Sequence, residues 1–364
     1  MAKVNPDFVK ELKKFGADDF KACFSCGNCT AICATTDKDN SFPRKLIRYS
    51  ILGLEEEIKA SVDPWMCYYC GDCSNACPRK AEPGNLMMAL RRYLTSKYDW
   101  TGLSGLLYKN VNAYVVAFIL IFAAVFGMQI GGVFTNEEFL HYGHLFEMFA
   151  IGGIFILILL PNIIHMWYLI VWSKTKKIVL KDYIVSIKEL FIHMFTQKRS
   201  LQCEVEESTP EEIKENKLWW FEHFILVVGY LSLLFTTVFL NWFKTENMIV
   251  HYIGYIFSAI IFIVTFDFVI RRIRKKSQKS TFTHPSDWFF VIWLFLMGAT
   301  AFAVRLFIDL DIIENNFWMY LFHISILAQW ALIIVPFGKW THFLYRSFAM
   351  YFSSILNTPV KKNS

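Results

Sequence analysis

Eight of the nine cysteines in this chain stand in two short runs with the same spacing. Each run reads C-x2-C-x2-C-x3-C, and Pro78 follows the second run. In this pattern three thiolates of a run bind one iron–sulfur cube, whereas the fourth thiolate binds the other cube. The spacing therefore predicts two [4Fe–4S] clusters with crossed ligands. The predicted ligands are Cys23, Cys26, Cys29 and Cys77 for one cluster, and Cys67, Cys70, Cys73 and Cys33 for the other.

Other uses of these cysteines fit the spacing less well. A disulfide framework needs an oxidising compartment, and zinc sites usually combine two C-x2-C pairs rather than runs of four. Gly27 and Gly71 each follow the second cysteine of a run, where the backbone must come close to a cluster. The runs differ in one respect, because Ala34 stands where the second run has Pro78. Cys203 stands alone, and we expect it to be a free thiol.

Six of the nine histidines lie within or beside long apolar segments, where polar side chains are costly. Three belong to the expected inner side of a membrane and three to the outer side. The inner group is His165, His223 and His342, and the outer group is His144, His251 and His323. Two layers of histidines suggest axial ligands for two b-type haems, each held by two helices. For each histidine alone, an interfacial position or a hydrogen bond to a quinone is the alternative.

The elements that position these residues are helices. The chain is 55% hydrophobic and 18% aromatic, which indicates a membrane protein with a soluble part. Six apolar segments are each long enough to cross ~30 Å of hydrocarbon. We place them near 112–132, 144–172, 219–241, 248–270, 287–309 and 317–340. The predicted fold is all-α, with an α-helical two-cluster ferredoxin domain over 1–100 and a six-span cytochrome b-like bundle over 101–364.

Helical periodicity also runs through the first hundred residues. We expect a short amphipathic helix within residues 1–20, two short helices over 43–60 separated at Gly53, and a helix over 85–97. No stretch alternates in the way that a strand would.

Basic residues set the expected orientation in the membrane. The loop 173–218 carries nine Lys or Arg and the stretch 271–280 carries six, whereas the opposite loops are mostly acidic. Basic loops face the cytoplasm, so we expect a multi-pass protein of the cytoplasmic membrane with both termini inside. The first residues contain no apolar run, so we expect no signal peptide. Residues 178–196 within the cytoplasmic loop look amphipathic and should lie on the inner surface or dock a partner.

The sixth segment is expected to carry His323 near one end and His342 near the other. Their separation corresponds to about 28 Å of helix rise, nearly the hydrocarbon thickness. On a straight helix the two side chains would point about 100° apart. Pro336 lies between them and is expected to kink or rewind the helix.

These motifs resemble known families. The first hundred residues resemble the iron–sulfur C subunits of heterodisulfide reductases. The remainder resembles the E subunits of those enzymes and the gamma subunit of respiratory nitrate reductase. The best local match is Pro-Phe-Gly-Lys-Trp-Thr-His, which ends in His342. Both halves in this order resemble the C subunits of the quinone-interacting membrane-bound oxidoreductase complexes of sulfate reducers.

The resemblance implies that His323 and His342 bind haem and that His223 is an inner partner. The nitrate reductase subunit has another histidine ten residues further on, where this chain has Leu233. The second ligand of the outer haem must therefore come from another position, and we prefer His251 over His144. On the inner side, His165 is the alternative to His223 as a haem ligand. Arg305, Glu147 and Asp267 are candidates for haem propionate contacts or quinone proton exchange.

The same resemblance implies a role and partners. The chain would pass electrons between menaquinone and soluble flavin- and iron–sulfur-bearing subunits of the heterodisulfide reductase A-like type, towards adenylylsulfate reductase. The sequence itself contains no G-x-G-x-x-G flavin fingerprint. A haem-free iron–sulfur membrane anchor is the main alternative. A redox-coupled transporter is disfavoured, because the segments lack matching Gly/Pro breaks.

Overall fold

A computed structural model describes residues 3–174, 178–197, 210–235, 248–275 and 283–357, without the side chains of residues 210–212, 250 and 251. Every regular element in these ranges is a helix, so the all-α prediction is confirmed. The chain forms two compact units. The first unit comprises the described parts of Met1–Lys109, Leu160–Trp220 and Thr341–Ser364, and the second comprises those of Asn110–Leu159 and Phe221–Trp340.

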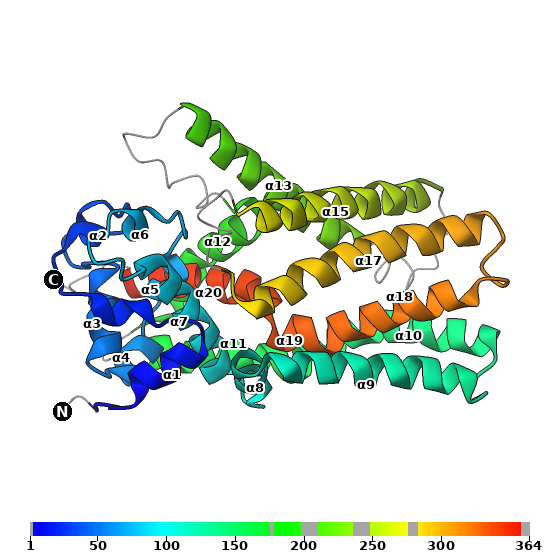
Figure 1. The fold of residues 1–364 in the computed structure, drawn as a ribbon, viewed down its shortest axis with the longest axis horizontal. Helices are drawn as coiled ribbons and strands as arrows, with labels where there is room; N and C mark the ends of the chain where they lie inside the picture. The colour runs from blue at the N-terminus through cyan, green and yellow to red at the C-terminus, as the bar shows by residue number, and fades with distance from the viewer. Residues whose placement is uncertain (1–2, 175–177, 198–209, 236–247, 276–282, 358–364) are drawn as a thin grey trace. The chain divides into compact units, whose positions relative to one another are not determined.

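The first unit is built on α7 (Pro83–Tyr98), whose side chains are mostly buried. Phe8 and Phe15 meet the ring of Tyr93 edge-on, and the Arg92 Nε donates to the Phe15 carbonyl at 2.7 Å. The surrounding helices of this unit are short (Figure 1). They are α1 (Phe8–Lys14), α2 (Asn28–Ala31), α3 (Arg44–Ile51), α4 (Glu55–Lys59), α5 (Asp63–Met66), α6 (Asp72–Asn75), α8 (Leu103–Lys109) and α11 (Leu160–Trp167).

The break at Gly53 is confirmed, because α3 ends before it and α4 begins after it. Gly53 has φ +71°, a left-handed conformation that favours glycine. Its carbonyl accepts a hydrogen bond from the Asn5 N–H at 2.8 Å. A Cβ at this position would lie 2.2 Å from the Asn5 carbonyl oxygen. The glycine therefore serves both the turn and the close approach of the N-terminal segment.

The amphipathic stretch 178–196 forms α12 (Leu180–Thr196), which packs against α20 (His342–Asn357). The Tyr351 hydroxyl donates to the Tyr183 carbonyl at 3.2 Å, and Ser354 donates to Ser186 at 3.0 Å. Other apolar side chains of α12, including Phe191, stay exposed. One face of this helix is thus covered by the C-terminal helix of the same unit.

The second unit contains long helices that include most of the six candidate membrane spans. By length and composition these spans are Val111–Ile130, Asn136–Trp172, Ile213–Leu234, Tyr252–Arg274, Pro285–Asp309 and Phe317–Phe337. The corresponding helices are α9 (Val111–Ile130), α10 (Asn136–Ile154), α13 (Pro210–Leu234), α15 (Met248–Arg274), α17 (Pro285–Asp309), α18 (Phe317–Gln329) and α19 (Val335–Phe337). The second span starts earlier than expected, because Thr135 forms a capping box with Glu138.

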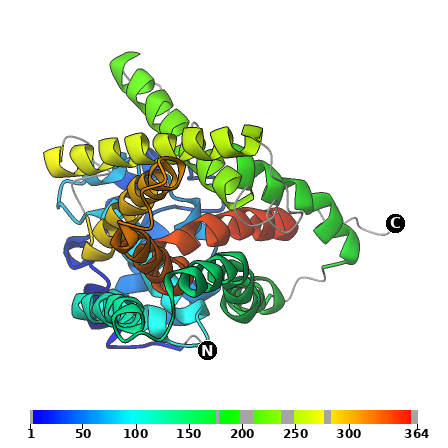
Figure 2. The ribbon, with the colours of Figure 1, turned by 90° about the vertical axis from the view of Figure 1, so that its right-hand side faces the viewer.

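Within this unit α17 lies between α15 and α18 (Figures 1 and 2). Gly298 of α17 allows α15 to approach, since a Cβ there would lie 3.0 Å from the Ile261 Cγ2. Gln329 of α18 joins two neighbours: its Oε1 accepts from Trp293 of α17 at 2.7 Å, and its Nε2 donates to the Phe118 carbonyl of α9 at 2.9 Å. In hydrocarbon such paired polar groups hold helices in register.

The sixth span ends earlier than the sequence suggested. A π-helical turn over Trp330–Ile334 precedes α19, which ends at Phe337, and Gly338 is extended. His342 instead begins α20. The expectation that His323 and His342 lie on one continuous helix was therefore wrong, because the helix stops directly after Pro336.

Candidate functional site

The two cysteine runs fold into the same local conformation. Gly27 has φ +95° and Gly71 has φ +97°, and each precedes a single helical turn, α2 and α6 respectively. Two residues earlier, Ser25 and Tyr69 also have positive φ values, +62° and +59°. Positive φ is uncommon outside glycine and often marks functional loops. The sequence signalled the glycines but not Ser25 or Tyr69.

Backbone N–H groups point at the cysteine sulfurs. Ser25 N donates to the Cys23 Sγ at 3.4 Å, and Tyr69 N donates to the Cys67 Sγ at the equivalent place, 3.3 Å away. A third bond joins Ala81 N to the Cys77 Sγ at 3.3 Å. Hydrogen bonds to cysteine sulfurs stabilise their negative charge and tune the potential of an iron–sulfur centre.

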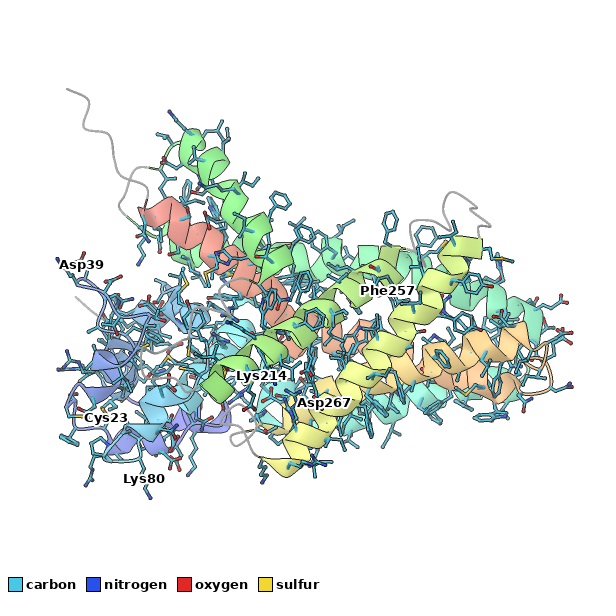
Figure 3. All side chains as sticks on the ribbon, turned by 90° about the horizontal axis from the view of Figure 1, so that it is seen from above. Cys23, Asp39, Lys80, Lys214, Phe257 and Asp267 are labelled. Carbon is cyan, nitrogen blue, oxygen red and sulfur yellow. The ribbon has the colours of Figure 1, made fainter. Side chains whose placement is uncertain are left out.

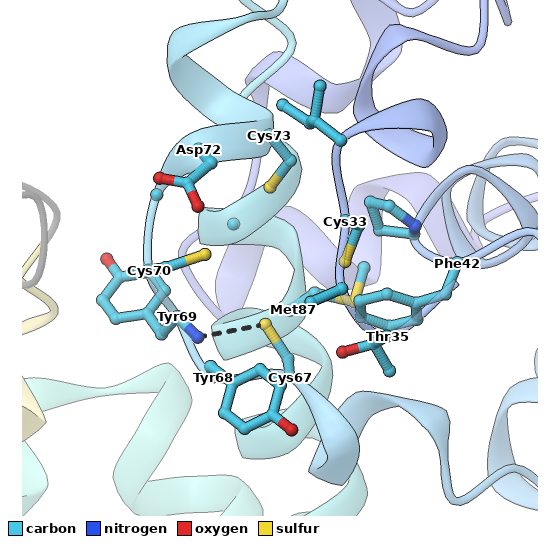
Figure 4. A pocket seen from close by; sticks show the side chains of 15 residues that line it. Cys33, Thr35, Phe42, Cys67, Tyr68, Tyr69, Cys70, Asp72, Cys73 and Met87 are labelled. Atoms are coloured by element: carbon cyan, nitrogen blue, oxygen red, sulfur yellow. Dashed lines mark hydrogen bonds between the residues drawn. The ribbon is translucent and has the colours of Figure 1, made fainter. Parts of the chain in front are cut away.

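One pocket brings together cysteines from both runs (Figure 4). The fourth cysteine of the first run lies with the first three of the second run, so the pocket is lined by Cys33, Cys67, Cys70 and Cys73. The side chains of Phe42, Tyr68 and Met87 complete its mainly apolar wall. These four thiols are the set that the crossed pattern predicts for one cluster.

The other four cysteines are also close to one another. Burial raises the pKa of the Cys29 thiol, and the charges of Cys23, Cys26 and Cys77 raise it further. The fourth cysteine of the second run, Cys77, thus acts electrostatically on Cys29 of the first run. All eight thiols are free of disulfides.

Arg91 of α7 lies beside the pocket that contains Cys67. Its Nε donates to the Pro64 carbonyl at 2.8 Å, and its Nη2 donates to the carbonyls of Trp65, at 3.3 Å, and Cys67. Burial raises the pKa of Cys67 to about 11, and the Arg91 charge opposes that increase. A half-buried guanidinium therefore lies where it favours negative charge on this thiol set.

The donor sets fit iron–sulfur cubes. Four thiols that line one mainly apolar pocket are the ligands that such a cube takes. In the ranges that the structure describes, no three His, Cys, Asp or Glu side chains converge on a point as a single metal ion would require. In a cube each thiolate binds a different iron atom, so its ligands must be spread apart.

The predicted haem histidines lie in different places. His323 of α18 and His144 of α10 line one cavity of about 450 Å³ in the second unit. His223 lies in α13 of that unit and is half-buried. His342 and His165 lie in the first unit instead. His342 begins α20. His165 belongs to α11, and its Nδ1 donates to the Tyr98 carbonyl at 3.1 Å. The backbone of His251 belongs to α15, but its side chain is outside the described part, as is all of Cys203.

Three charged residues were also singled out from the sequence. Arg305 and Glu147 line the same cavity as His144 and His323. Asp267, which Figure 3 labels, instead pairs with Arg271 one turn further along α15, with 2.5 Å between Oδ2 and Nε. Sequence reasoning missed two participants, Thr300, which contacts His323, and Tyr320, which lines the cavity. Only helical phasing from α17 and α18 could have suggested them.

The fold and the site combine a helical domain that carries two sets of four cysteines with helices long and apolar enough to span a membrane, and this chain was compared with known proteins. Residues 19–81 match the family model described as "4Fe-4S dicluster domain". The chain is 35% identical over 88 residues to a protein of Archaeoglobus profundus that is named as similar to the C subunit of heterodisulfide reductase. The match covers 24% of this chain and 47% of that protein.

Two further relatives are similar over the same part. The C subunit of the H(2):CoB-CoM heterodisulfide,ferredoxin reductase of Methanothermobacter marburgensis is 34% identical, over 22% of this chain and 43% of the relative. The iron-sulfur C subunit 2 of the CoB–CoM heterodisulfide reductase of Methanocaldococcus jannaschii is 29% identical, and the match covers 32% of this chain and 64% of the relative. The chain spans about half the length of the curated relatives it matches. No solved structure matches it significantly. The N-terminal part is thus similar to a 4Fe-4S dicluster domain and to the C subunits of heterodisulfide reductases.

Proposed function

We propose that this chain is the membrane electron-transfer subunit of a quinone-linked oxidoreductase complex. It would pass electrons between the menaquinone pool and soluble partner subunits. The observation that carries the proposal is the pocket in which Cys33 joins Cys67, Cys70 and Cys73, on a chain that also has six candidate spans. Crossed thiol sets of this kind suit two clusters that exchange electrons.

The cysteines would hold two [4Fe–4S] clusters in the crossed sets given above. Each cluster would supply a one-electron carrier. The side chains and the backbone of this chain would exclude water from the clusters and tune their reduction potentials. Apolar side chains such as Phe42 and Met87 exclude water from one thiol set, and the N–H groups of Ser25 and Tyr69 stabilise charge on the sulfurs.

The membrane part would hold two b haems, which would supply one-electron steps between quinone and clusters. The proposed ligands remain His223, His251, His323 and His342, with His144 and His165 as alternatives. The support from the second unit is the cavity, which histidines from two helices line together with the charged side chains of Glu147 and Arg305. Because polar side chains inside a membrane span are costly, their presence there favours a functional role.

The partners follow from similarity. The relatives are named as subunits of heterodisulfide reductases. We therefore propose flavin- and iron–sulfur-bearing subunits of the heterodisulfide reductase A-like type as electron acceptors or donors. The resemblance to complexes of sulfate reducers makes adenylylsulfate reductase the proposed final acceptor, in the cytoplasmic membrane with both termini inside.

The test is a cofactor inventory of the full chain purified in detergent. We expect about eight cluster irons and about two b haems per chain, by iron and sulfide analysis and pyridine haemochrome. Both haems and clusters should be reduced by a menaquinol analogue. Clusters without haem would contradict electron transfer through haems and would favour the alternative, a haem-free iron–sulfur membrane anchor. Zinc in place of iron would contradict the proposal as a whole.

A further inference from the structure

The cavity in the second unit collects an unusual number of polar groups for a membrane-spanning bundle. Its volume of about 450 Å³ falls within the range of cofactor sites. The polar and charged side chains that line it include His144 and Glu147 of α10, Arg305 and Asp309 of α17, and Tyr320 and His323 of α18. The rest of the wall is largely apolar and includes Leu233 and Met297.

His323 is held in a defined orientation. Its side chain is buried, with 9% exposure, and its Nδ1 lies 2.9 Å from the Thr300 Oγ1. The Thr300 hydroxyl has one proton, and the Leu296 carbonyl, 2.8 Å away, can only accept a hydrogen bond. When the hydroxyl donates to the Leu296 carbonyl, as a threonine hydroxyl in a helix commonly does, it accepts from the Nδ1–H of His323. The Nε2 of His323 is then unprotonated and carries the free lone pair.

A histidine fixed in this way is prepared to bind a metal. Metal-binding histidines usually donate their other ring N–H to an oxygen, which sets the tautomer and raises the basicity of the ligand. His323 also lines the cavity together with a second histidine from another helix, His144. The Nδ1 of His144 faces the Glu147 carboxylate at 4.0 Å. Two histidines from two helices are the ligand set of a six-coordinate b haem.

Space and charge in the cavity agree with a haem. Gly143, next to His144, lets Tyr320 pack against α10, since a Cβ there would lie 2.4 Å from the Tyr320 hydroxyl. Gly254 does the same for Arg305, whose Nη1 would be 2.3 Å from a Cβ. Arg305 thus packs against the backbone of α15 and supplies a positive charge to the cavity, whose lining also includes the carboxylates of Glu147 and Asp309. Haem propionates are carboxylates, and a guanidinium is their strongest partner.

We infer that this cavity is a b-haem site in which His144 and His323 are the two axial ligands and Thr300 is the positioning residue for His323. This inference rests on the proposed function, which gives the chain its haems. It replaces His251 by His144 as the partner of His323. Arg305 compensates the propionate charge at the same site.

The experiment uses the full chain in detergent, with haem counted by pyridine haemochrome and each haem followed by redox titration and low-temperature EPR. We expect His144→Ala and His323→Ala each to lose about one haem per chain, and the double variant to lose no more than either single variant. His144→Met should keep the haem but change its EPR signal and raise its potential, as Met/His ligation does.

Thr300→Val tests the positioning role. Without the acceptor, the His323 imidazole becomes less basic, so we expect the potential of this haem to rise while the other haem stays unchanged. Thr300→Ser should restore the original potential. The matched control is Thr265→Val on α15, where the hydroxyl bonds only the helix carbonyls of Ile261 and Phe262. That variant should leave both haems unchanged.

The outcomes separate the inference from the proposed function. Wild-type chain with two haems, both retained in His144→Ala, would overturn the His144 assignment and leave the electron-transfer function standing. Full haem content with a raised KM for quinol in both histidine variants would make the cavity a quinone site and overturn the inference. No haem in wild-type chain with intact clusters would remove the haem part of the proposed function itself. Cluster content, measured in each sample, identifies variants that fail to fold.

Discussion

The Arg91 guanidinium donates to the backbone carbonyl of Cys67 and lies 5.8 Å from the centre of the Trp65 ring. It therefore places a fixed positive charge beside one thiol set. Reduction adds negative charge to a cluster, and a nearby cation favours it. We expect Arg91→Gln to lower the midpoint potential of the cluster on Cys67, by about 59 mV for each 1.4 kcal/mol of lost charge interaction.

Arg92 offers the matched control, because it is the next residue of α7 and its Nε donates to the Phe15 carbonyl instead. Arg92→Gln removes the same charge and should shift neither cluster to the same extent. Redox titration followed by EPR measures both variants. Equal shifts in the two variants would show that Arg91 acts only through the general charge of the domain.

The crossed ligand sets predict a pattern in double variants. Cys33→Ser should remove one cluster, about four iron atoms per chain. Adding Cys67→Ser should remove no more iron, because both residues belong to the same proposed set. Adding Cys23→Ser instead should remove most of the remaining iron, because Cys23 belongs to the other set.

Iron and sulfide analysis of the full chain gives the readout for these variants. Cys203→Ser is the control, since Cys203 belongs to neither run. If Cys33→Ser combined with Cys23→Ser lost only one cluster, whereas Cys33→Ser with Cys67→Ser lost both, each run would hold its own cluster. The crossed assignment would then be wrong.

The depressed pKa of Glu55 leads us to expect that the first unit loses stability as the pH falls. Burial by itself would raise the pKa of Glu55, but hydrogen bonds from Lys59, Tyr93 and Asn5 outweigh it and lower the pKa to about 2. A carboxylate whose pKa is depressed on folding stabilises the protein above its unfolded pKa, and this contribution disappears as the pH falls towards 2. The contribution at pH 7 is about 3 kcal/mol at most.

Glu55→Gln should therefore lower the melting temperature of the first unit at pH 7, with the difference from wild type shrinking between about pH 4.5 and 2. Glu56→Gln is the control: it also pairs with Lys59, at 3.1 Å, but its side chain is 55% exposed. Circular dichroism melts at several pH values measure both variants. A difference for Glu55→Gln that stayed constant with pH would contradict the role of its charge.

We expect a side chain at position 53 to clash with the N-terminal segment of the first unit. Gly53→Ala forces a Cβ to within 2.2 Å of the Asn5 carbonyl oxygen at a positive φ. We expect a loss of more than about 1 kcal/mol in the free energy of unfolding of the first unit. Gly105→Ala is the control within α8, where the nearest atom would be 3.5 Å away. It should be neutral or stabilising, because alanine favours helix. Urea titration measures the free energy of unfolding of both variants. Equal losses in Gly53→Ala and Gly105→Ala would refute the steric argument.

Much of the fold followed from local patterns. The apolar segments predicted all six candidate spans, and Gly53 predicted the break between α3 and α4. These features are properties of single stretches, so the sequence is enough to predict them. The sixth span failed where two breakers, Pro336 and Gly338, act together: the helix ended instead of continuing to His342.

The parts that the sequence did not predict depend on tertiary contacts. The hydrogen bond between Thr300 and His323 joins two helices, and its existence depends on the rotation of each helix about its axis. The Arg91 contact likewise depends on how α7 packs beside the second cysteine run. For the same reason, spacing alone favoured His251 over His144, although the cavity contains His144. That choice remains to be tested by the variants above.

The two cysteine runs have matched backbones, in which Ser25 is equivalent to Tyr69 and Gly27 to Gly71. Two equal half-domains that exchange their last cysteine are what a two-fold symmetric homodimer would produce, since each half completes the other. The surroundings of the two runs nevertheless differ, because Arg91 lies beside Cys67 and Ala34 stands at the place equivalent to Pro78. Since hydrogen bonds and nearby charges set the potential of an iron–sulfur centre, we expect the two centres to differ in potential, which gives electron flow between them a preferred direction.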